Sequence, residues 1–143
     1  ARFHGKYGNS RDAILQTNAI FDDFIAVRQA ITDGDQSQVE ATMPNIRLEW
    51  HKIIAGTAVH YLNAAISNIE DPALKMHELS EAYAFIGNLV HSTDTYNISL
   101  EQRDECRALL GSNFYETSVD DINNAKEWLV NNTAITLVDS ANL

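Results

Sequence analysis

Three side chains in this sequence have the chemistry to hold a metal ion together: His60, His77 and Glu81. His77 and Glu81 lie four residues apart, so on a helix they share one face and could chelate one ion. Such a set would suit zinc, iron or the iron of a haem, and it requires all three side chains to converge on one point. On the expected helix, however, His77 and Glu81 point away from the apolar face. This position favours an exposed, charge-patterned surface over a metal site.

His60 is a separate case, because it lies on the narrow polar strip of a helix that should be mostly buried. A buried imidazole needs hydrogen-bond partners. Glu49 is too far along the same helix to be one, so the partner must come from another helix, and Glu78 and Glu81 are candidates. The sequence favours a structural hydrogen bond here over a ligand or a catalytic base.

Signatures of enzymes are absent from the chain. It contains no nucleophile elbow, phosphate-binding loop, HExxH motif or paired CxxC, which predicts a protein that is not an enzyme. Cys106 is the sole cysteine, so no internal disulfide can form, and its place among apolar helical positions predicts a buried, inert thiol. Asp33-Gly34-Asp35 lacks the later ligands of a calcium loop and is interpreted as a turn followed by a helix cap.

The element that must position these residues is a central helix over residues 45–69. At about 3.6 residues per turn, two roughly opposite sides of this stretch are apolar and only a narrow strip is polar. The strip carries Glu49, Lys52, Asn63 and Ser67, with Gly56 and His60 among them. A helix that is apolar on nearly every side is normally enclosed by other helices.

The neighbouring helices are expected from their start and stop signals. They cover residues 10–33, 36–43, 72–91, 99–111 and 118–130, capped in turn by Ser10, Asp35, Asp71, Ser99 and Ser118. Pro44 predicts either a boundary or a kink between residues 36–43 and the central helix, and both remain open. The tail 133–143 shows no clear period. The prediction is an all-α bundle of five to six helices in a single domain, 1–143.

Composition limits the classes of partner. Hydrophobic residues make up 45% and charged residues 21%, as expected of a globular chain. The net charge of −10, without a Lys/Arg cluster, argues against nucleic acid and anionic membranes as partners. No apolar run reaches the roughly 18 residues of a membrane span. The chain begins at Ala1 rather than methionine, which favours a processed or truncated product.

Two segments carry a resemblance to a known family. They are Glu49–Asn63 (EWHKIIAGTAVHYLN) and His77–Ile86 (HELSEAYAFI). They resemble a family of uncharacterised bacterial envelope proteins that occur alongside imelysin-type iron-regulated proteins, with similarity from about Arg11 to Trp128. The matching positions are Trp50, Ile54, Ala55, Thr57, Val59, His60, Tyr61, Leu62 and Asn63, then His77, Ser80, Glu81 and Phe85.

This resemblance implies a context and no reaction. Members of the family are longer, with an additional N-terminal helical half that is missing here. The implied location is the periplasm or cell envelope, with a link to iron acquisition. We therefore expect a non-enzymatic binding or structural module that docks on a protein partner or on its missing N-terminal half. Metal or haem binding by His60, His77 and Glu81 is the alternative.

Overall fold

The computed structural model describes residues 17–91 and 96–143, and in these ranges the chain forms an all-α bundle without strands. The α-helices are α3 (Thr17–Asp33), α4 (Gln36–Ser67), α5 (Pro72–Asn88), α6 (Leu100–Leu109), α7 (Val119–Asn132) and α8 (Leu137–Asn142), and a 3₁₀ turn, η2 (Leu89–His91), follows α5. Six α-helices confirm the predicted fold class. The predicted helix start at Ser10 lies outside the described residues.

Helix α4 is the centre of the fold, as predicted. It packs against α3, α5, α7, α8 and η2. Between residues 53 and 59 every side chain except Ile54 is buried. Because seven residues make almost two turns, this burial extends around the whole helix. Although α4 has 32 residues, no helix in the described ranges is both long and apolar enough to cross a membrane.

The bounds of the central helix differ from the prediction. It runs from Gln36 to Ser67 rather than over residues 45–69, and it continues through Pro44 without a boundary. Proline removes one backbone donor from the helix. Buried Thr42 and Ile46 on either side of Pro44 keep both segments packed in one helix. The boundary that Pro44 could have imposed is therefore absent.

The predicted starts and stops of the other helices are confirmed where the structure describes them. The Asp71 side chain accepts hydrogen bonds from the first turn of α5, and Ser99 and Ser118 form capping boxes that open α6 and α7. Gly111, with a φ of 76°, follows the end of α6, where only glycine adopts this left-handed conformation easily.

Helix α8 was not expected, because the tail showed no clear period. Its start is nevertheless encoded locally, since Thr136 and Asp139 form a capping box of the same kind as those of α6 and α7. Six residues are too few to show a helical period, although they suffice for one cap.

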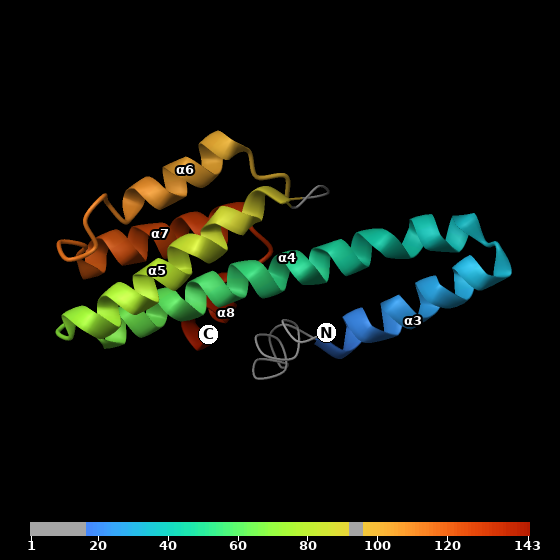
Figure 1. The fold of residues 1–143 in the computed structure, drawn as a ribbon, viewed down its shortest axis with the longest axis horizontal. Coiled ribbons are helices and arrows are strands. Elements are labelled where there is room, and N and C mark those ends of the chain that lie inside the picture. The colour runs from blue at the N-terminus through green and yellow to red at the C-terminus, as the bar shows by residue number, and fades with distance from the viewer. Residues whose placement is uncertain (1–16, 92–95) are drawn as a thin grey trace.

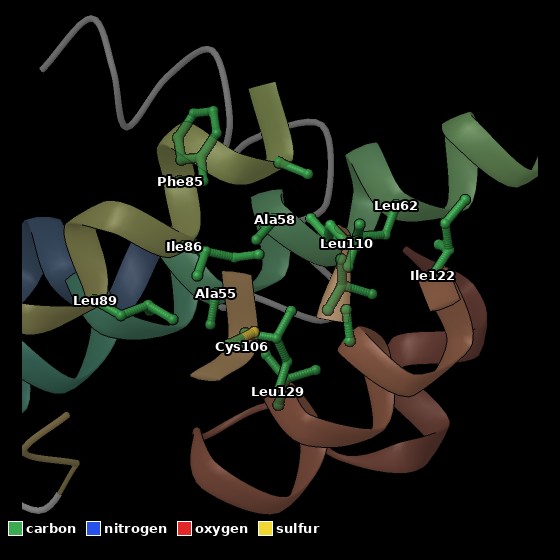
Figure 2. Close-up of a cluster of buried hydrophobic side chains, with 14 of the residues drawn as sticks. Ala55, Ala58, Leu62, Phe85, Ile86, Leu89, Cys106, Leu110, Ile122 and Leu129 are labelled. Carbon is green, nitrogen blue, oxygen red and sulfur yellow. The ribbon is translucent and has the colours of Figure 1, made fainter. Parts of the chain in front are cut away.

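The main core fills the space between α4, α5, α6 and α7, as Figure 2 shows. Ala55 and Ala58 of α4 lie beside Ile86 of α5, and these three side chains, like Leu62 of α4, are fully buried. The small alanines let α5 approach α4 closely. Cys106 is also fully buried in this core, and burial raises the pKa of its thiol to about 12, so the predicted inert thiol is confirmed as a buried one.

A second, smaller core joins α3 to the first half of α4. Ile20, Val27 and Ile46 are its buried members, and Val39, Met43 and Trp50 pack against them. Figure 1 shows that this helical pair extends away from α5, α6, α7 and α8. We call α3 together with residues 36–50 of α4 the arm. From here on, the bundle means residues 51–67 of α4 together with α5, α6, α7 and α8. The arm and the bundle thus share α4 and have separate cores.

A close approach of α6 to α5 depends on Gly87. The Arg107 guanidinium donates to the Tyr83 carbonyl oxygen at 2.8 and 3.1 Å and lies 3.9 Å above the centre of the Tyr83 ring. A Cβ atom at residue 87 would overlap this guanidinium. Gly87 therefore leaves space for a cation that fixes α6 on α5.

Replacing this glycine should destabilise the protein, although alanine is the better helix former. In Gly87→Ala the guanidinium must leave Tyr83, and we expect a net loss of about 1 kcal/mol in the free energy of unfolding. Urea denaturation measures this loss. In an Arg107→Ala background the same substitution should instead stabilise the helix by up to about 1 kcal/mol. An equal effect of Gly87→Ala in both backgrounds would contradict the steric role of Arg107.

Candidate functional site

His60 has a structural partner in the bundle. Its Nδ1 lies 2.7 Å from a main-chain oxygen of Leu143, and because this oxygen only accepts, Nδ1 carries the proton. One turn away, the Asn63 side chain donates to the Ser140 carbonyl oxygen at 3.0 Å. The partner comes from another segment, as expected, but it is Leu143 rather than Glu78 or Glu81. These two bonds attach α8 to α4.

The other two predicted ligands lie on α5. His77 is exposed and Glu81 is half-buried, in keeping with the charged surface that the sequence favours. Among residues 17–91 and 96–143, no three His, Cys, Asp or Glu side chains are gathered so that they could hold a metal ion. The convergence of His60, His77 and Glu81 that the metal hypothesis requires is therefore not found in this part of the chain.

An exposed apolar face of α3 is the first feature that could serve a function. Phe21, Phe24, Ile25 and Ile31 are 64%, 47%, 41% and 65% exposed. At 100° per residue these four side chains fall within an arc of about 120° on the helix. Helix α4 is the only described element against which α3 packs extensively. Large apolar side chains thus remain open to solvent on the side of the arm that α4 does not cover.

Charges surround this apolar face unevenly. Asp22 and Asp33 follow one edge of it, and the Gln29 side chain donates to the Asp33 carboxylate at 2.9 and 3.0 Å. Arg28 lies within the arc itself, between the positions of Phe24 and Ile25. The face therefore presents apolar side chains, one central cation and an acidic border.

The second feature is His51, a buried histidine without hydrogen-bond partners. The residue is 2% exposed, and neither Nδ1 nor Nε2 has a hydrogen-bond partner among the described residues. The ring is stacked on Tyr96, with 5.0 Å between the ring centres and 11° between the planes. Burial lowers the pKa of His51 to about 4, so the ring is neutral at pH 7.

His51 lines a cavity of about 220 Å³ at the place where α4 leaves the bundle. Helix α4 contributes Arg47, Trp50, His51 and Ile54 to its wall, and the end of α5 with η2 contributes Asn88, Leu89 and His91. The wall is mainly apolar, and among its described residues His51 is the only buried polar side chain. Native proteins seldom leave a buried polar group unsatisfied, which makes this part of the structure a candidate site.

His51 was missed in the sequence, although a signal for it exists. At 100° per residue, His51 lies on the same side of α4 as Ala55, Ala58 and Leu62. A histidine in such an apolar register is expected to be buried. His60, which the sequence pattern singled out instead, lies on the polar strip and is only half-buried.

Residues 2–136 match a family model described as a domain of unknown function (DUF4856). No curated protein and no solved structure matches the chain.

Acidification should destabilise the fold through His51. The folded protein holds the pKa of this ring at about 4, whereas the ordinary value is 6.5. Between these values the unfolded chain binds a proton that the folded chain does not bind. The stability that His51 contributes by staying neutral is therefore fully present above pH 6.5 and is lost as the pH falls towards 4. From pH of about 7.5 to pH of about 5, this group should lower the free energy of unfolding by about 2 kcal/mol.

Urea denaturation at both pH values measures this effect in the wild type, in His51→Phe and in His77→Phe. His51→Phe should lose about 2 kcal/mol less than the wild type on acidification. His77→Phe, which replaces an exposed histidine, should follow the wild type. Identical pH dependence in all three proteins would show that His51 is not held neutral by burial.

Proposed function

The chain belongs to the family of the domain of unknown function DUF4856, and because this description assigns no activity, we propose a function from the geometry. The protein is a non-enzymatic docking module. It binds an amphipathic helix, either of a protein partner or of a further N-terminal part of its own polypeptide. The docking surface is the exposed apolar face of α3, formed by Phe21, Phe24, Ile25 and Ile31.

The exposure of these four side chains on one continuous arc carries the proposal. Burying one large apolar side chain contributes roughly 1.5–3 kcal/mol, so covering four of them provides a substantial driving force. An amphipathic helix covers such a face with apolar side chains spaced three and four residues apart. Among the described elements, α3 packs extensively against α4 alone, so the outer side of α3 is not covered by another described helix.

The charges on α3 support a partner of defined chemistry. Asp22 and Asp33 lie along one edge of the apolar face, so a lysine or arginine on the matching edge of the partner helix would be attracted to them. Arg28 lies among the apolar side chains, and it would be satisfied by a carboxylate near the middle of the partner. The expected partner is therefore an apolar helix with basic residues along one border and a central Asp or Glu.

The motifs around Trp50–Asn63 and His77–Phe85 support a wider context. Through their resemblance to envelope proteins that accompany imelysin-type proteins, we propose a location in the periplasm or cell envelope of a bacterium and a role in iron acquisition. An iron-uptake component is thus the first class of partner to search for.

Site-specific photo-crosslinking in bacterial cells tests the docking surface. A benzophenone side chain at Phe24 should give one discrete adduct in the envelope fraction, more abundant under iron limitation. Mass spectrometry should place the crosslink in a helical segment with apolar residues at the spacing above. Adding Phe21→Asp and Ile31→Asp should reduce the adduct at least about ten-fold, because both changes put charge into the apolar contact.

The matched control is the same benzophenone at Leu137 of α8, which is 75% exposed but lies outside the arm. It should give no discrete adduct. If Phe24 and Leu137 crosslink to the same products, or if the Asp substitutions leave the Phe24 adduct unchanged, α3 is not the docking surface. An adduct confined to the cytosolic fraction would contradict the proposed location.

A further inference from the structure

The cavity between α4 and the end of α5 lies next to the exposed apolar face of α3. We propose that the amphipathic helix of a protein partner, docked on α3, inserts one leucine or phenylalanine side chain into this cavity as its anchor. The inference rests on the proposed docking function, and it adds the place where the partner helix is fixed.

The cavity lies on the strip of α4 between α3 and α5. Ile46, in the core of the arm, faces α3, and Ala58, in the core of the bundle, faces α5 (Figure 1). At 100° per residue these two directions are about 120° apart around α4, and Trp50 and Ile54 of the cavity wall fall between them. Trp50 also packs against the core of the arm, so the cavity adjoins the arm directly.

The exposed face of α3 borders the same strip. Helices α3 and α4 run antiparallel, so an approximate two-fold axis relates them, and the matching strip on α3 is reached in the same rotational sense as on α4. From the buried Val27, which faces α4, this sense leads to Ile31 and then to Phe24, both exposed. A helix that lies along this side of the arm therefore contacts the face of α3 and reaches the cavity.

The size and the wall of the cavity suit one apolar side chain. An apolar cavity of about 150 Å³ is large enough for benzene, so the roughly 220 Å³ here accommodates the end of a leucine or phenylalanine. Trp50, Ile54 and Leu89 supply the apolar wall. The anchor makes no hydrogen bond with His51, because both ring nitrogens are enclosed. A large side chain that fills such a pocket is typical of the residues that dominate binding energy.

The positions of the two features set the spacing of apolar residues in the partner. Because α3 and α4 join at Gly34-Asp35, Phe24 lies level with about residue 45 of α4. The cavity, near Trp50 and His51, is about six residues or about 9 Å further along α4. This distance is close to two helical turns, so the anchor and the residue that covers Phe24 should be about seven positions apart in the partner.

A second crosslinking position tests the anchor. Asn88 is exposed at the rim of the cavity. A benzophenone side chain there should form an adduct in cells with the same protein as a benzophenone at Phe24. Mass spectrometry should map both crosslinks to one helix of that protein, about seven residues apart, with a leucine or phenylalanine beside the Asn88 crosslink.

A blocked cavity provides the complementary test. Asn88→Trp places a large ring at the cavity opening and should reduce the Phe24 adduct at least about five-fold. The matched control is Asn124→Trp, at an exposed position of α7, which should leave this adduct unchanged. Both variants should keep the circular dichroism of the wild type, because both positions are exposed.

Failure of the anchor is distinguishable from failure of the docking surface. If Phe24 gives its adduct but Asn88→Trp reduces it no more than Asn124→Trp does, the docking surface stands and the cavity is not the anchor. Crosslinks from Asn88 to a different protein, or within this polypeptide, would also overturn the inference. Loss of the Phe24 adduct in the wild type would remove both proposals. If Asn88→Trp does not fold, the mapped Asn88 crosslink decides alone.

Discussion

The whole structure depends on one helix that supplies side chains to two separate cores. The second half of α4 is buried around its circumference by α5, α7 and α8, whereas its first half meets α3 on one side. A residue such as Ala58 therefore stabilises the bundle only, and Ile46 stabilises the arm only. Because both cores share one continuous helix, the orientation of the arm is set by the bundle.

Both proposed sites follow from this division. In the described part of the chain, α3 packs extensively against one helix, α4, whereas α5 and α7 each pack against several elements. Large apolar side chains on the outer side of α3 therefore stay exposed. The cavity beside His51 lies between the core of the arm and the core of the bundle. Trp50 packs on the core of the arm, and Ile54 and Leu89 belong to the core of the bundle. Packing is least continuous at such a junction, which leaves space for a side chain of the partner.

Local signals in the sequence were sufficient for most of the fold. Asp71-Pro72, the Ser99 and Ser118 capping boxes and Gly111 each determine a helix end through contacts within a few residues. The central helix could be identified because the apolar pattern on nearly every side of α4 is also written in the sequence itself. What failed depended on distant contacts. Continuity through Pro44 depends on packing against α3, and a six-residue helix such as α8 has no period to detect.

The functional residues were harder to predict, because a residue type and its spacing do not determine its environment. Glu78 and Glu81 were the candidate partners of His60, and the partner is instead a main-chain oxygen 83 positions away along the chain. His51 was not predicted as a site residue, although only this histidine is both buried and without a hydrogen-bond partner in the described part of the chain. Burial at the junction of two cores depends on the tertiary arrangement.

The separation of the two cores is the central claim, and native-state hydrogen exchange in low urea measures it most directly. If the arm has its own small core, amides of α3 and of residues 36–50 should exchange through a partial opening. Its free energy and urea dependence should be smaller than those of α5 and α7. Exchange of α3 only through global unfolding, with the same free energy and urea dependence as the bundle, would contradict the account.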